Sequence, residues 1–287
     1  MSKFHLGNLR KFQSLPTRTA TGIVYLLIGA MPIEAEIHKR QLSFLYNIMS
    51  SNNTSIQKLM DRQLIMNIDN QLSFFCRATA TLDMYNLPSI DDIRKELPSK
   101  IKWKSICKQA IHAFWTEKMQ TSIKDKSSLK FMNIKDLKVG NDHSVWTSLN
   151  SSVTEVKKGI IKARMLTGTY LLQKNKQKFS NGKIDPTCPL CNSGEEDLAH
   201  MLLYCAATFS IRKEYFRDIK QIVIEHIGKE AWINTFTRPD SLVKLLIDCT
   251  SFEELFKSKE QLSQLMRMTT ELCYKLHIRR IWLRKES

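Results

Sequence analysis

Three cysteines and one histidine between residues 185 and 205 stand at spacings that suit a metal ion. They follow the pattern Cys188-x2-Cys191-x8-His200-x4-Cys205. A tight turn at Pro189-Leu190 would aim the first two sulfurs at one ion, and a helix-like run from 195 to 204 would supply the second pair. Because three sulfurs and one imidazole fill a tetrahedral shell, no position remains for a reactive water. The motif predicts one structural Zn²⁺ ion with these four ligands: Cys188, Cys191, His200 and Cys205.

Two features of this motif leave alternatives open. Cys188 and Cys191 alone are also compatible with incidental cysteines or with a redox-active dithiol. His200 and Cys205 lie five residues apart, which on a regular α-helix places them about 140° out of phase. The two side chains can therefore share an ion only if the helix ends or distorts near Tyr204.

A basic segment leads directly into the motif. Between residues 157 and 183 the chain carries eight basic residues and no acid, namely Lys157, Lys158, Lys162, Arg164, Lys174, Lys176, Lys178 and Lys183. Tyr170 and Phe179 are interleaved with them. Since lysines contact phosphates and aromatic rings stack on bases, we predict that these basic residues and Tyr170 form a nucleic-acid-binding strip, called the basic strip below. A merely solubilising surface is the alternative.

The acidic residues do not form an interpretable catalytic site. A polymerase presents an aromatic-x-Asp-Asp word between apolar strands, whereas Asp91-Asp92 follows Pro88 and Ile90. The form Ser89-x-x-Asp92 instead predicts a capping box at a helix start. No Gly-rich phosphate loop and no nucleophile-base pair at a meaningful spacing is present. The sequence therefore predicts no catalytic residue and no enzymatic activity.

The elements that must position these residues are helical throughout. The clearest amphipathic helix is predicted from 99 to 126, another from 210 to a stop at Gly228, and a long terminal helix from 259 to 285. No strand pattern is found. The prediction is an all-α, multi-helix assembly with one small zinc-knuckle insertion. Its regions are a helical region 1–130, an irregular linker 131–150, a unit 151–228 with the basic helix, the knuckle and the next helix, and a C-terminal helical tail 229–287.

Composition restricts the partner and the compartment. Lys and Arg outnumber Asp and Glu 44 to 28, giving a net charge of +16, which favours an anionic partner such as nucleic acid, with an acidic membrane surface as the competing explanation. The longest apolar run, 22–33, is too short to span a bilayer and contains Pro32. Seven cysteines, three of them in the metal motif, favour a reducing compartment. We expect a nuclear or cytoplasmic protein that is not secreted and does not bind a membrane.

Several words of the sequence resemble the C-terminal zinc-knuckle region of non-LTR (LINE-type) retrotransposon reverse transcriptases. These are the stretch 161–173 (IKARMLTGTYLLQ), the segment 185–191 (DPTCPLC), the acids at 195–197 and the segment 200–205 (HMLLYC). In that family an Arg/Leu-Thr-Gly stretch, a basic spacer, Cys-x-x-Cys, a Glu and His-x4-Cys follow in this order. Weaker similarity, as at 15–18 (LPTR) and 29–34 (GAMPIE), extends the resemblance over residues 9–225.

The resemblance implies a nucleic-acid-handling module whose zinc ligands are the four residues named above. It also implies an RNA or DNA partner, with a polymerase as a further partner in trans, because the polymerase fingers and palm are missing. Some members carry a nuclease marked by Pro-Asp and a later acid-x-Lys word. Pro239-Asp240 is present here, but no such word follows it. The chain thus resembles a detached or remnant tail of such a polymerase. A non-catalytic protein-protein interaction module with a zinc-stabilised loop is the alternative.

Overall fold

The structure is a computed structural model that describes residues 2–67 and 69–286. Within this part of the chain all regular elements are helices, and only two isolated β-bridges occur, Ile28 with Asp142 and Thr187 with Glu195. The predicted all-α class is therefore confirmed. None of the helices over these residues combines the length and the apolar character needed to cross a bilayer.

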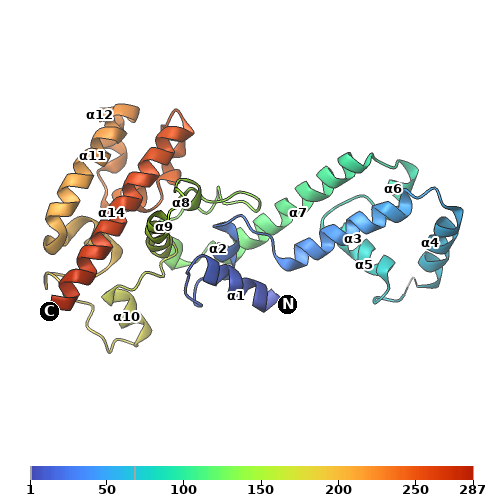
Figure 1. Ribbon diagram of the computed structural model, residues 1–287, viewed down its shortest axis with the longest axis horizontal. Coiled ribbons are helices and arrows are strands. Elements are labelled where there is room, and N and C mark those ends of the chain that lie inside the picture. Colours follow the sequence, from blue (N-terminus) through green and yellow to red (C-terminus); the bar gives the residue numbers. More distant parts are fainter. Residues whose placement is uncertain (1, 68, 287) are drawn as a thin grey trace.

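The first half of the chain forms an N-terminal lobe, residues 2–123, which extends from α1 and α2 at the centre of Figure 1 to α4 at its right-hand end. Helices α2 and α3 pack along α7, and α5 packs on α3. The elements of this lobe are α1 (Ser2–Phe12), α2 (Thr21–Leu26), α3 (Ile33–Met49), α4 (Thr54–Met66), α5 (Phe74–Met84), α6 (Ile90–Lys95) and α7 (Lys100–Ile123).

Helix α7 is the scaffold of this lobe, and its buried residues recur every four positions. They are Trp103, Cys107, Ile111, Trp115, Met119 and Ile123. A helix turns 100° per residue, so a four-residue repeat drifts by about 40° at each step and winds around the helix. Near its start the stripe meets α3, where Trp103 Nε1 donates to the Leu42 carbonyl at 3.2 Å. Near its end it meets α2, where a Cβ on Gly22 would lie 2.9 Å from Ile123. One helix thereby holds two partners.

The second half forms a C-terminal lobe, residues 144–286, built around the long helix α14. Helix α14 packs against both α9 and α11 (Figure 1). It buries Leu265, Leu272 and Leu276 completely. The elements are α8 (Ser144–Thr147), α9 (Val153–Leu166), α10 (Gln173–Phe179), the π-helical turn η2 (His200–Tyr204), η3 (Ala206–Thr208), α11 (Phe209–Ile227), α12 (Lys229–Phe236), α13 (Pro239–Ile247), η4 (Cys249–Leu255) and α14 (Lys259–Glu286). The predicted boundary at 228 is thus not a packing boundary, because residues 229–286 share one core with 151–228.

The connector between the lobes, residues 124–143, contains only the short turn η1 (Ser127–Leu129), whereas the segment 131–150, predicted as an irregular linker, includes the one-turn helix α8. It is nevertheless fixed on both sides. Its Gly140 amide donates to the Gly29 carbonyl at 2.7 Å, and its Asn133 amide donates to the Asp248 carboxylate at 2.7 Å. The connector, called the strap below, is therefore hydrogen-bonded to both lobes.

Candidate metal centre and basic strip

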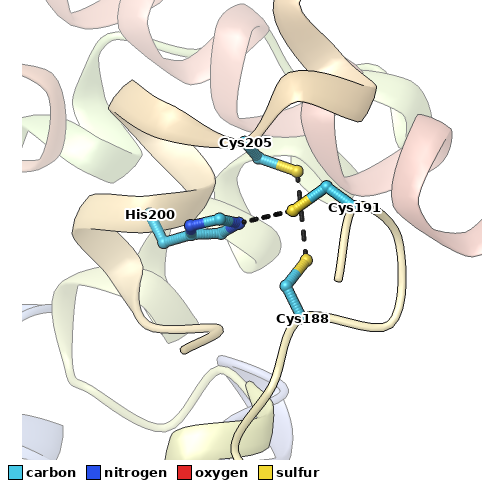
Figure 2. A group of neighbouring side chains, drawn as sticks. All are labelled: Cys188, Cys191, His200 and Cys205. Carbon is cyan, nitrogen blue, oxygen red and sulfur yellow. Dashed lines mark hydrogen bonds between the residues drawn. The ribbon is translucent and has the colours of Figure 1, made fainter. Parts of the chain in front are cut away.

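The four predicted ligands lie together in the C-terminal lobe, with their ligand atoms all within 4.8 Å of one another (Figure 2). The sulfurs of Cys188 and Cys205 are 3.9 Å apart, and the Cys191 sulfur is 3.2 Å from His200 Nε2. A tetrahedral zinc with bonds of about 2.0 to 2.3 Å places its donors roughly 3.5 to 3.8 Å from each other. The four side chains could therefore hold one metal ion, and their donor set suits Zn²⁺.

The turn that carries the first two cysteines is stabilised by backbone hydrogen bonds. The Cys188 amide donates to the Gly194 carbonyl at 2.8 Å, and the Asn192 amide donates to the Cys188 carbonyl at 2.9 Å. Asn192 adopts a left-handed conformation with φ of 52°, which Asn tolerates better than most residues. In this arrangement the Cys191 sulfur faces His200 and the Cys188 sulfur faces Cys205 (Figure 2). A redox dithiol is now the weaker interpretation of the Cys-x-x-Cys pair, because a third sulfur and an imidazole nitrogen lie within 4.8 Å of its sulfurs.

The second pair of ligands is brought into phase by the π-helical turn η2. Its closing hydrogen bond runs from the Cys205 amide to the His200 carbonyl, five residues back, at 2.8 Å. A π turn widens the helix so that residues five apart stand above one another. The prediction that the helix must end or distort near Tyr204 is confirmed, because the π turn spans the residues from His200 to Tyr204, between the two ligands.

The surroundings favour the neutral thiol at Cys188 and Cys205 and the thiolate at Cys191. Cys188 is fully buried, and burial raises the pKa of its thiol to about 12. Burial also raises the pKa of Cys205. At Cys191 burial acts in the same direction, but hydrogen bonds from Ser193 and the neighbouring thiols outweigh it and lower the pKa to about 6. Metal binding at this site would therefore release protons, as it does wherever cysteines become thiolate ligands.

A buried ion pair joins the segment 185–205, called the metal loop below, to helix α14. Glu196, 1% exposed, accepts from Arg280 Nε at 2.6 Å and from Arg280 Nη2 at 2.8 Å. The same carboxylate accepts from the Gln173 amide at 2.8 Å, at the start of α10. Burial lowers the pKa of Arg280, but the hydrogen bonds to Glu196 outweigh it and raise the pKa. One side chain beside the metal site thus fixes both α10 and α14.

The structure disperses the basic strip. Four of its nine predicted members are exposed, namely Lys157, Lys174, Lys178 and Lys183. Lys174 is paired with Glu195 at 2.7 Å and Asp197 at 3.4 Å, and the pair with Glu195 raises its pKa. The other three exposed lysines have no acidic partner among the described residues. These three are the free charges of the strip.

Two members of the strip are buried, and the prediction that they contact nucleic acid is wrong. Lys162 is fully buried and donates its ammonium to the Leu246 carbonyl, because it lies on the same face of α9 as Gly159 and Leu166. Tyr170 is 7% exposed, and its hydroxyl lies 2.8 Å from His277 Nδ1. Burial raises the pKa of Tyr170. Its ring therefore packs inside the lobe and is not available for base stacking.

Three further members are half-buried, and two of them, Lys158 and Arg164, make structural contacts. Lys158 forms ion pairs with Glu155 at 2.6 Å and with Glu271, and the hydrogen bonds to these two carboxylates raise its pKa. Arg164 donates from Nε and Nη2 to the Ser14 carbonyl at 2.9 and 2.7 Å, which joins the two lobes. Burial, and then the nearby Arg284 and Arg280, lower the pKa of Lys176. The charge pattern of the sequence alone therefore does not distinguish exposed lysines from those that make structural contacts.

Sequence reasoning missed a buried His-Asp pair at the strap. His143 Nε2 lies 3.5 Å from the fully buried Asp248. Burial raises the pKa of Asp248, but His143, Thr250 and Asn133 outweigh it, so the pKa is lowered. His143 Nδ1 accepts from the Val145 amide at 3.1 Å. Because Nδ1 accepts from the backbone and Nε2 faces Asp248, the pair does not activate a nucleophile and is structural. The two residues are 105 positions apart, and no local pattern relates them.

In comparisons with known proteins, no family model, no curated protein and no solved structure matches the chain.

Proposed function

We propose that the chain is a nucleic-acid-binding module whose C-terminal lobe is organised by one structural Zn²⁺ ion. The observation that carries this proposal is the Cys3His cluster, whose four protein donors would complete a tetrahedral shell. Beside it, Glu196 holds the start of α10, with its exposed lysines, against the lobe. A closed shell leaves no open position for a substrate. In this proposal zinc therefore stabilises the fold of a binding surface and takes no part in catalysis.

Charge supports nucleic acid as the ligand of that surface. The chain carries a net charge of +16, and Lys157, Lys178 and Lys183 are exposed without acidic partners among the described residues. Such cations bind phosphates by displacing condensed counterions. No disulfide bond joins cysteines within the described residues, which supports the nuclear or cytoplasmic location expected above. Kinship with the tail of a retrotransposon reverse transcriptase, and a polymerase partner in trans, are supported by the sequence words alone and remain part of this proposal.

The test is a titration of labelled single-stranded RNA, single-stranded DNA and duplex DNA at several salt concentrations, followed by fluorescence anisotropy. With about four to six phosphate contacts, log Kd against log salt should change with a slope of magnitude roughly 3 to 5. A slope near zero on all three ligands contradicts the proposal.

Metal content is measured on the same protein by mass spectrometry. We expect one zinc per chain, and loss of zinc in Cys191→Ser. Cys76→Ser is the matched control, since Cys76 lies in the N-terminal lobe away from the cluster. Chelation should abolish the salt-dependent binding together with the fold of residues 185–205. Binding that survives complete zinc removal would show that the metal does not organise the surface.

A protein-interaction module is the second candidate, and one observation favours it. At the far end of the N-terminal lobe, the helix α4 and the loop after it expose Leu59, Ile65, Met66 and Leu72, each more than half exposed. Exposed apolar residues that lie close together often mark protein interfaces. Nanomolar binding of a protein partner that is lost in Leu59→Asp, in a chain that shows no salt-dependent binding of nucleic acid, would favour this candidate.

A further inference from the structure

A cleft of about 790 Å³ lies where the two lobes meet. One wall comes from the N-terminal lobe at residues 18–22 and 122–123 and from the strap at 126–131, and the other comes from the end of α9, from α10 and from residues 197–199 of the metal loop. In Figure 1 this is the region between α2, α9 and α10. Its volume is within the range of roughly 300 to 1,000 Å³ typical of ligand sites.

The cleft is lined by positive charge from both lobes. Five cations line it against the single carboxylate of Asp197, and they are Arg18, Lys126, Lys130, Lys174 and Lys178. Two of them are partly neutralised: Lys174 by Glu195 and Asp197, and Lys130 by Asp240 at 4.0 Å. Lys126 and Lys178 are exposed and have no acidic partner among the described residues. These two lysines, one from each wall, are the strongest available phosphate contacts.

An aromatic ring lies at the side of the cleft beside an arginine. Phe179 is 59% exposed although it is large and apolar, and it lines the cleft. The Arg18 guanidinium sits 4.8 Å from the centre of its ring, and Arg18 Nη2 donates to the Thr169 carbonyl at 2.8 Å. An exposed ring oriented by a fixed arginine is a stacking platform for an unpaired base.

The junction that shapes the cleft is rigid. Gly168, at the end of α9, has φ of +64°, and a Cβ built on it would lie 2.4 Å from the Ser128 carbonyl oxygen of the strap. Arg164, one turn earlier, donates to the Ser14 carbonyl of the N-terminal lobe. Because the backbones of the C-terminal lobe and the strap meet here without room for a side chain, the cleft is preformed, and ligand binding need not order it.

We propose that this cleft binds a single-stranded polynucleotide, with Lys126 and Lys178 contacting successive phosphates and Phe179 stacking on a base. This inference rests on the proposed function and specifies its site. A single strand fits better than a duplex, because an unpaired base offers its face to Phe179 whereas a duplex keeps its bases stacked inside. The cleft thus includes two members of the basic strip and three cations outside it.

The experiment measures the affinity of the full, zinc-loaded chain for labelled oligothymidylate, oligouridylate and a duplex of equal length. The variant Lys126→Glu with Lys178→Glu should weaken single-strand binding at least about 10-fold, and should lower the salt slope by about 0.7 for each lysine. The matched control is Lys58→Glu with Lys100→Glu, which makes the same change in net charge at exposed lysines of the N-terminal lobe outside the cleft. The control should stay within about twofold of the wild type at physiological salt, where distant charges are screened.

A second variant separates stacking from charge. Phe179→Ala should weaken single-strand binding by about 5- to 150-fold with an unchanged salt slope, whereas Phe179→Tyr, which keeps the ring, should bind like the wild type. Equal losses in the cleft and control pairs, or unchanged binding in Phe179→Ala, overturn the cleft as the site while the proposed function stands. Absence of salt-dependent binding in the wild type overturns the proposed function itself. Tighter binding of the duplex than of both single strands also overturns the inference.

Discussion

The N-terminal lobe and the metal loop of the C-terminal lobe are stabilised by different interactions. In the N-terminal lobe two buried tryptophans of α7, Trp103 and Trp115, are 2% and 5% exposed and contact α3 and its neighbours directly. In the C-terminal lobe the segment 180–198, which approaches the metal site, contains one fully or nearly buried side chain besides Cys188, and that side chain is the charged Glu196. The N-terminal lobe is thus packed around apolar side chains. The metal loop of the C-terminal lobe has instead a buried ion pair and the four candidate ligands.

The largest expected effect is that of metal removal. Structural zinc contributes on the order of 10 kcal/mol to the folding of such loops, so Cys188→Ser or chelation should unfold residues 185–205. Hydrogen exchange followed by mass spectrometry should show lost protection there and at α10, with α3 and α7 unchanged. Equal loss of protection in α7 would show that the two lobes do not differ in the way described.

The mirror experiment is Trp103→Ala. Removing this buried ring should cost about 3 to 5 kcal/mol, because a cavity replaces its contacts with Leu42 and Tyr46. Chemical denaturation gives the magnitude. Zinc content should remain at one ion per chain, and a large loss of zinc would indicate that the lobes fold as one cooperative unit.

The ion pair beside the metal site should have a comparable or somewhat smaller effect. Glu196→Gln leaves the buried Arg280 without a counter-charge, which we expect to cost about 3 kcal/mol and to loosen α14 at its contact with the loop. The control is Glu195→Gln, since Glu195 is an exposed partner of Lys174 and should contribute less than about 1 kcal/mol. Equal effects of the two changes would remove the ion pair from the comparison.

The smallest effect concerns pH. Burial, followed by Arg280 and Arg164, lowers the pKa of His277 to about 4 from its ordinary 6.5. The unfolded chain therefore binds a proton at this residue between pH 6.5 and 4 that the folded chain does not bind. The stability contribution of neutral His277 is fully present above pH 6.5 and is lost as the pH falls toward 4.

His277→Asn keeps an acceptor near the Tyr170 hydroxyl and should reduce the slope of unfolding free energy against pH in this window by up to one proton. Comparison with the wild type at equal zinc loading separates this effect from protonation of the metal ligands. Identical slopes in the two proteins would contradict the assignment.

Much of the fold and of the metal site follows from local patterns. The capping box at Ser89, the start of α7 at Ser99 and the end of α11 at Gly228 all stand where capping chemistry places them. The four ligands were predictable because their spacing is short and their chemistry restrictive. Even the need for a distortion near Tyr204 followed from helix geometry.

What the patterns do not contain is which face of a helix is covered by a distant element. Lys162 appears basic in the sequence but points into the core between α9 and α13, and Arg280 meets Glu196 from 84 residues away. The cleft likewise combines Arg18 with Lys178, residues that only the packing of two lobes brings together. Long-range pairing of this kind depends on the tertiary arrangement and leaves no periodic trace.

The π turn between His200 and Cys205 has a consequence for everything that follows it. Cys205 itself leaves the helix, with ψ of 115°, and the chain re-enters helical structure through η3 and α11. The carbonyl of Cys205 then accepts from Arg212 Nη1 at 2.9 Å and from the Thr208 hydroxyl at 3.3 Å. The residue that supplies the last sulfur thus also anchors the first turn of α11, and a change that moves its backbone would disturb that helix as well as the metal site.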